Sequence, residues 1–202
     1  MSAEPDHVEM RVVGSLLEKQ RTTPEAYPLS VNALRLACNQ ATNRDPVVDY
    51  DERTIVAALE RLHRRGWTRM ASGPGSRARK YRHMLDTELS LDRPELAVLC
   101  VLMLRGPQTP GELKQRTERL HPFADLAAVE AVLDGLIGRD LATRIERRPG
   151  QKEQRYEQTL GGEQSEGAAP PPVPEGDRLE RLERELAQLR AEVASLREQL
   201  NG

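Results

Sequence analysis

The sequence has few of the residues that mark secreted, membrane-embedded or metal-binding proteins. Only two cysteines occur among its 202 residues, Cys38 and Cys100, and each is isolated among apolar residues of an expected helix. Zinc sites and redox pairs need closely spaced partners, so we interpret both as buried thiols. The longest apolar run, Leu96 to Leu104, has nine residues and is far too short to cross a membrane.

Signals for export and for catalysis are also missing. The first ten residues, MSAEPDHVEM, contain neither the basic segment nor the apolar core of a signal peptide, which predicts a cytoplasmic protein with no membrane contact. The four histidines are scattered, and no HExxH, CxxC, GxSxG or phosphate-loop pattern occurs. We therefore expect neither an enzyme nor a bound cofactor or metal.

Charge is balanced over the whole chain but not locally. The formal net charge is −2, yet eight arginines and lysines and no acidic residue lie between Arg61 and His83. A helix that begins near Asp51 is expected to lead into a strand at 67–70, a turn at SGPGS and a returning strand at 79–83. A helix followed by a basic hairpin is typical of a winged helix-turn-helix, in which both elements face nucleic acid.

The remaining elements fall into two similar sets. Apolar spacing predicts a first helix over about 6–19, and Ser30 is placed to cap a second helix that begins at Val31. In the second set, capping boxes begin two helices, and a third helix and two strands follow. These expected features are the boxes at Asp92–Glu95 and Thr109–Glu112, the helix at 125–137, the strand at 141–145 and the strand through Arg155 and Tyr156.

A fixed offset links the two hairpins. Pro74, Gly75 and Tyr81 recur 75 residues later as Pro149, Gly150 and Tyr156. A common offset on both sides of a turn indicates a duplicated hairpin. We therefore predict a mainly α fold with small β-hairpin wings (α+β), made of two tandem winged helix-turn-helix domains and a C-terminal coiled-coil helix. The expected ranges are 6–85 and 90–160 for the domains, 161–176 for a Pro/Gly-rich linker and 177–201 for the heptad helix.

The C-terminal helix has a strict heptad pattern, which predicts a coiled coil that joins two copies of the chain. Under a parallel arrangement, the flanking Arg and Glu residues would form attractive pairs. The alternative is that this helix folds back on its own domains, and three heptads alone are marginal. The expected dimer-forming residues are Leu179, Leu182, Leu186, Leu189, Val193, Leu196 and Leu200.

Candidate DNA contacts come from the first domain. Long cations in a hairpin could reach phosphates, and amides and guanidinium groups after the second helix could read base edges. The alternatives are that the hairpin is simply a solvated basic face and that the polar group after the second helix caps helices and ties down loops. The candidates are Arg53, Arg61 and Arg64 on the third helix, Arg77, Arg79, Lys80 and Arg82 in the hairpin, and Asn43 and Arg44.

Two features argue against DNA contact elsewhere. Asp51 and Glu52 would repel phosphate at the start of the third helix, and the corresponding helix of the second domain has no Arg or Lys before Arg139. The run from Leu96 to Leu104 is apolar nearly all round and must be buried on more than one side. We expect the second domain to serve domain packing or homodimer formation.

Three long segments resemble one known family. TTPEAYPLSVNALRLACNQATNRDPV, GSRARKYRH and LRGPQTPGELKQRTERLHPFAD are similar to sequences of the YceH-like family, an uncharacterised family of bacterial tandem winged-helix proteins. The resemblance covers residues 6–160 and implies a double winged-helix fold in a bacterial cytoplasm. It implies no catalytic residue and no cofactor. The sequence thus favours a DNA-binding protein, with a transcriptional regulator as one form; the rival is a scaffold that binds a protein partner.

Overall fold

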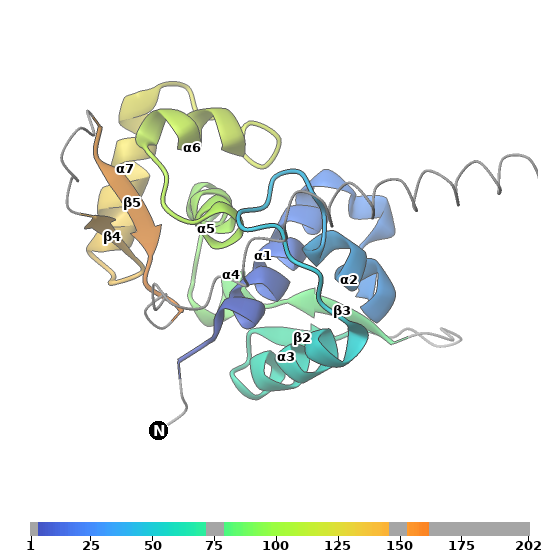
Figure 1. Ribbon diagram of the computed structural model, residues 1–202. Coiled ribbons are helices and arrows are strands. Elements are labelled where there is room, and N and C mark those ends of the chain that lie inside the picture. Colours follow the sequence, from blue (N-terminus) through green and yellow to red (C-terminus); the bar gives the residue numbers. More distant parts are fainter. Residues whose placement is uncertain (1–3, 72–78, 146–152, 162–202) are drawn as a thin grey trace, which may run out of the picture. The chain divides into compact units, whose positions relative to one another are not determined.

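The structure is a computed structural model that describes residues 4–71, 79–145 and 153–161. These residues form a mixed α+β protein with seven α-helices and two small antiparallel sheets (Figure 1). They belong to a single compact unit that spans residues 1–164. The tip of the first hairpin, the linker beyond residue 161 and the expected heptad helix, with all seven of its apolar positions, lie outside the described residues.

The first repeat contains three helices and a three-stranded sheet, close to the expected positions. Asp51 Oδ1 accepts a hydrogen bond from Thr54 N at 2.8 Å and so caps the third helix, while the Ser30 hydroxyl accepts from Ala33 N and caps the second. The elements are α1 (His7–Thr22), the short 3-10 helix η1 (Pro24–Ala26), β1 (Leu29–Ser30), α2 (Val31–Cys38), α3 (Glu52–Arg64), β2 (Thr68–Met70) and β3 (Lys80–His83).

The second repeat follows a one-turn helix, α4 (Leu85–Glu88). Both expected capping boxes are present, at Asp92 with Glu95 and at Thr109 with Glu112, and each satisfies two backbone N–H groups that a helix start leaves unpaired. The elements are α5 (Arg93–Arg105), α6 (Pro110–Thr117), α7 (Leu126–Ile137), β4 (Ala142–Ile145) and β5 (Arg155–Gln158).

The two repeats share a detail of strand pairing. In the first, β1 pairs with β3 so that Leu29 lies opposite Tyr81, and Ser30 then caps α2. In the second, an isolated bridge joins Gln108 to Tyr156, and the next residue, Thr109, caps α6. In each repeat, the tyrosine of the hairpin therefore holds the residue that precedes the cap of the second helix.

A single hydrophobic core joins the repeats. Every residue from Leu96 to Leu104 on α5 is buried, and α5 packs against α1 of the first repeat as well as α6, α7 and β5 of its own (Figure 1). The expected boundary between residues 85 and 90 therefore separates two sets of elements that share one core. The apolar circumference of α5 is covered within the chain. No helix of the described part is long and apolar enough to span a membrane.

The crossing of α1 and α5 depends on the absence of a side chain at Gly14. A Cβ atom placed there would lie 3.0 Å from Leu104 Cδ2 and 3.1 Å from Met103 Cβ. We expect Gly14→Val to lower the free energy of unfolding by about 1–3 kcal/mol, the usual cost of overpacking a core. Urea unfolding followed by circular dichroism measures this change.

The matched control is Gly135→Val in α7, where an added Cβ meets no atom within 4 Å. This substitution should alter stability by a few tenths of a kcal/mol at most, because only helix propensity changes. Equal effects at the two glycines would contradict the close approach of α1 and α5.

Candidate nucleic-acid interface

The outer face of the β2–β3 hairpin carries an uncompensated group of cations. Antiparallel register places Arg69 directly opposite Arg82, and both side chains are exposed. Side chains alternate along a strand, so Lys80 lies on the same face as Arg82. Like charges directly opposite each other destabilise a sheet, so this arrangement does not serve the hairpin itself. We call Arg69, Lys80 and Arg82 the hairpin cations.

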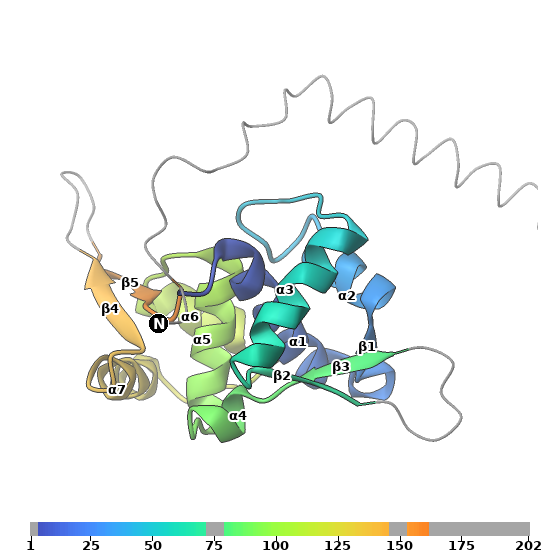
Figure 2. The same cartoon turned by 90° about the horizontal axis from the view of Figure 1, so that it is seen from below.

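The inner face of the same hairpin is anchored in the core. Thr68 and His83 lie opposite each other and are buried. The Tyr27 hydroxyl accepts a hydrogen bond from His83 N at 2.9 Å, and Thr68 Oγ1 lies 3.4 Å from the Leu59 carbonyl of α3. These contacts fix which face of the hairpin points outward. They also place the hairpin beside α3 at one end of the described residues (Figure 2).

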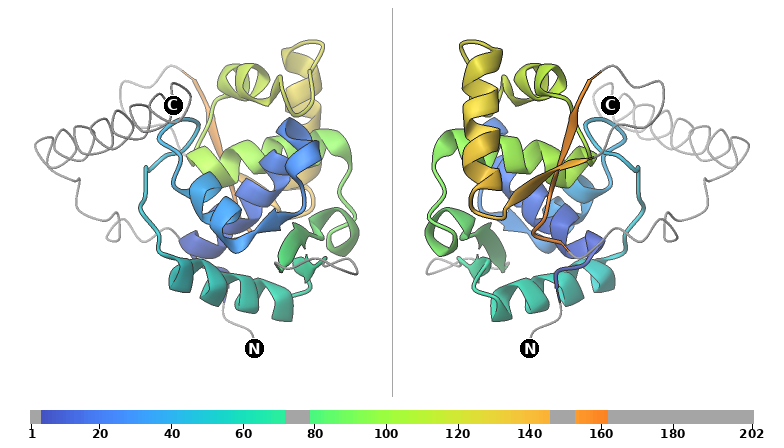
Figure 3. Two further views of the ribbon diagram at one scale, coloured as in Figure 1. Left: turned by 90° about the vertical axis from the view of Figure 1, so that its right-hand side faces the viewer. Right: turned by 90° about the vertical axis from the view of Figure 1, so that its left-hand side faces the viewer.

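The described arginines of the second hairpin differ from the hairpin cations, because each has a carboxylate partner. Arg144 Nη2 lies 2.6 Å from Asp134 Oδ1 of α7, and Arg155 Nη1 lies 3.0 Å from Glu112 Oε2 of α6. Both arginines of this hairpin in the described residues thus have a carboxylate partner. Strand β4 packs against α7, and β5 packs against α5 (Figure 3). None of the three hairpin cations of the first repeat has an ion pair with any described residue.

The candidates on α3 divide into two groups. Arg53 and Arg64 are exposed and have no ion pair within the described ranges. Arg61 is instead bound to the start of α1, with Nη2 2.7 Å from Asp6 Oδ2 and Nε 3.1 Å from Glu9 Oε2. Because two carboxylates neutralise Arg61, this side chain stabilises the packing of α3 on α1.

The N-terminal end of α3 is acidic, as the sequence indicates. Asp51 and Glu52 are exposed there. Hydrogen bonds from the side chain and backbone of Thr54 lower the pKa of Asp51, so its carboxylate stays charged at neutral pH. Phosphate would be repelled from this end, which leaves the C-terminal half of α3, with Arg64, as the part suited to a polyanion.

The polar group after α2 ties down a loop. Arg44 is only 6% exposed, and its guanidinium donates to Glu18 Oε2 at 2.6 Å and to the Ala37 carbonyl at 2.9 Å. Asn43 Oδ1 accepts from Arg105 Nη2 at 2.8 Å. Both side chains therefore have internal partners. Arg44 is buried and is not part of the surface that nucleic acid could reach.

The sequence candidates did not include one exposed cation, Arg69. Two of the candidates, Arg77 and Arg79, lie outside strand β3. Arg69 is a hairpin cation, but its position opposite Arg82 depends on strand register, which the basic composition of the segment does not define. Arg79 is exposed and directly precedes β3, on the side of the hairpin turn. Arg77 lies outside the described residues.

Comparison with known proteins defines the family. A family model described as "Protein of unknown function, DUF480" matches residues 6–151. This match covers most of the chain, and the chain belongs to this family. The matched range contains α1 to α7 and the strands β1 to β4.

Individual relatives carry the name UPF0502 protein and are bacterial. One from Pelobacter propionicus is 50% identical, and the alignment covers 95% of this chain and 93% of the relative. One from Geotalea daltonii is 52% identical over 89% of this chain and 83% of the relative. A third, from Shewanella sp., is 45% identical over 96% and 94%. The expectation of an uncharacterised bacterial family is thus confirmed.

Proposed function

We propose that the two repeats are winged helix-turn-helix domains and that the first binds duplex DNA, as a transcriptional regulator does. The element order of the first repeat supports this assignment: three helices, with a short strand before the second, lead to a hairpin. In the sheet order β1-β3-β2, β3 pairs with β1 on one side and with β2 on the other, and the β2–β3 hairpin is the wing of this assignment. The repeated tyrosine pairing supports the same assignment for the second repeat.

The observation that carries the proposal is the outer face of the first hairpin. Its three cations have no carboxylate partner in the described part of the chain, whereas Arg144 and Arg155, the described arginines of the second hairpin, do. An external polyanion provides the missing counter-charge, and phosphates of the DNA backbone are such a polyanion. Arg64, at the end of α3 nearest the hairpin, adds a fourth positive charge.

Salt dependence of DNA binding tests this proposal. Fluorescence anisotropy with a labelled duplex of about 30 base pairs should show affinity that falls steeply as salt rises, with a slope of about 0.9 per phosphate contacted. Combining Arg69→Ala, Lys80→Ala and Arg82→Ala should reduce that slope by about 2 to 3, because up to three contacts are lost. The weakening should be similar for unrelated duplex sequences, because phosphate contacts do not discriminate between bases.

The matched control removes the same charge from the second repeat, by Arg139→Ala, Arg144→Ala and Arg155→Ala. This variant should keep the wild-type slope, because the three arginines already have the carboxylate partners Glu95, Asp134 and Glu112. An equal reduction of the salt slope in both variants would mean that DNA binding depends only on the net charge of the protein. Failure of the wild type to bind any duplex at low salt would overturn the proposal.

A protein-binding scaffold is the second candidate, and exposed apolar side chains favour it. Leu36 on α2 is 55% exposed, Val47 is 40% exposed and Val56 on α3 is 36% exposed. A partner protein would bury such side chains. Absence of duplex binding at low salt, together with a co-purifying protein that Leu36→Glu releases, would favour the scaffold over the regulator.

The homodimer remains a prediction, and it is now supported by a smaller part of the sequence than before. The heptad positions from Leu179 to Leu200 are the part of the sequence that supports it. The surface of α5, which was expected to help form the dimer or pack the domains, is covered by α1, α6, α7 and β5 of the same chain. We therefore assign dimer formation to the heptad segment.

A further inference from the structure

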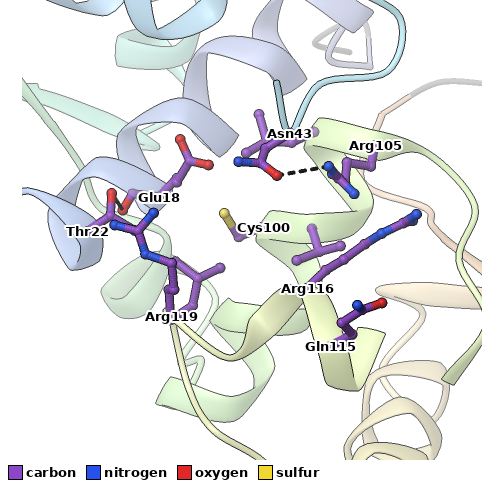
Figure 4. Close-up of a pocket in the computed structure, with 11 residues that line it drawn as sticks. Glu18, Thr22, Asn43, Cys100, Arg105, Gln115, Arg116 and Arg119 are labelled. Carbon is purple, nitrogen blue, oxygen red and sulfur yellow. Dashed lines mark hydrogen bonds between the residues drawn. The ribbon is translucent and has the colours of Figure 1, made fainter. Parts of the chain in front are cut away.

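A cavity of about 410 Å³ lies where α1, the loop after α2, α5 and α6 meet (Figure 4). Three arginines line it: Arg105 at the end of α5, Arg116 on α6 and Arg119 in the turn that follows α6. The close-up shows Arg105 and Arg116 on one side of this space, and Arg119 on the other side, beside Thr22 and Glu18 of α1. None of these arginines belongs to the proposed DNA surface.

The charge of the lining is positive. The acidic residue among the lining side chains is Glu18, and its carboxylate is already bound by Arg44 at 2.6 Å. Arg116 lies 3.5 Å from Glu112, but Glu112 also binds Arg155 at 3.0 Å. One carboxylate is thus shared between two guanidinium groups. Arg119 has no ion pair with a described residue.

The surroundings of Arg105 reflect this excess of positive charge. Burial, followed by the positive charges of Arg116 and Arg44, lowers the pKa of Arg105. Its guanidinium makes one hydrogen bond to an uncharged group, Asn43 Oδ1. Its remaining N–H groups are available to a ligand.

The rest of the lining is suited to a small organic molecule. Thr22 and Gln115 offer a hydroxyl and an amide, while Cys100, Val101 and Leu104 of α5 form an apolar side. The Cys100 thiol donates to the Gly14 carbonyl at 3.4 Å, and burial raises its pKa. It is therefore a neutral part of the wall rather than a nucleophile.

We propose that this cavity binds a small organic anion, whose phosphate or paired carboxylate groups are held by Arg105, Arg116 and Arg119. Guanidinium groups present parallel N–H donors that match the oxygens of phosphate and carboxylate. The apolar side accommodates a short carbon skeleton, and the volume fits a molecule of metabolite size. This site is independent of DNA binding, since it shares no residue with the hairpin cations.

Calorimetric titration of the full chain tests the site, with pyrophosphate and citrate as the two probes. Ionic strength is held constant with sodium chloride, so that non-specific screening is the same throughout. At least one probe should bind the wild type, and a response to pyrophosphate or to citrate distinguishes phosphate from carboxylate recognition. Arg116→Ala combined with Arg119→Ala should weaken binding at least about tenfold, because charged hydrogen bonds are lost.

The matched control, Arg53→Ala with Arg64→Ala, removes the same charge from α3 and should leave the affinity unchanged. Arg119→Ala alone, at an exposed turn position, should weaken binding without altering the urea midpoint of the ligand-free protein. Binding of neither probe to the wild type would overturn the proposal. Equal affinity in the wild type and the double arginine variant would overturn it as well.

Discussion

Replacing Glu18 with alanine is expected to destabilise the folded protein by about 3–5 kcal/mol, the usual cost of leaving a buried charge unpaired. The Arg44 side chain is fully buried and that of Glu18 is 13% exposed. Arg44 also donates to the Ala37 carbonyl, so this one guanidinium joins α1 to the end of α2 and the following loop. Without Glu18, the positive charge has no counter-charge in the interior.

Urea unfolding at pH 7 measures this effect, and Asp134→Ala is the control. Asp134 pairs with Arg144 at the same distance of 2.6 Å, but the two side chains are 63% and 57% exposed. Breaking an exposed pair should cost less than about 1 kcal/mol. Replacing both Glu18 and Arg44 with methionine should recover most of the loss. Equal effects of Glu18→Ala and Asp134→Ala would contradict the role assigned to burial.

The same pair makes stability depend on pH. Burial raises the pKa of Glu18, but hydrogen bonding and the charge of Arg44 outweigh burial, and the net change is a lowered pKa. A carboxyl group with a lowered pKa contributes stability above its unfolded pKa. That contribution is lost as pH falls through the lowered value, so this link weakens in acid.

Lowering the pH from about 6.5 to about 4 is expected to cost the protein on the order of 3 kcal/mol through His83 alone. Burial lowers the pKa of His83 to about 4; the charge of Asp86 raises it, and those of Arg21 and Arg82 lower it further. Nε2 lies 2.7 Å from Gln20 Oε1, and Nδ1 has no hydrogen-bond partner among the described atoms. The folded protein thus holds a neutral ring.

The direction of this effect follows from proton binding. Between the two pKa values, the unfolded chain binds a proton at this position and the folded chain does not, so stability rises with pH across that window. Urea midpoints measured from pH 4 to 7 should show a flatter profile for His83→Gln. A profile for His83→Gln that is identical to the wild-type profile would contradict the assignment.

Local signals in the sequence predicted much of the fold. Ser30, Asp92 and Thr109 were expected to cap helices and do so, because a capping interaction joins residues only three positions apart. The short β1 and α4 were missed. Two residues of strand or one turn of helix give no detectable period, and β1 exists because β3 pairs with it.

The composition of the sequence could not predict which basic residues form the candidate nucleic-acid interface. Arg44, Arg61 and Arg82 were all predicted as DNA contacts of the first domain. In the structure, Glu18 and Glu9 bind the first two from α1, 26 and 52 residues away in sequence. Only tertiary packing determines which cations keep free charge, and only strand register places Arg69 opposite Arg82.

The packing of α1 on α5 also bears on how such a chain can change over evolutionary time. Tandem domains with separate interiors can be shuffled, lost or exchanged between genes without harm to their neighbours. Here α1 and α5 approach so closely that a Cβ atom at Gly14 would lie 3.0 Å from Leu104 Cδ2, so a gene fragment that encodes one repeat would encode half of an interior. The two repeats must therefore be inherited together, although the described arginines of the second hairpin have carboxylate partners and the hairpin cations of the first have none among the described residues.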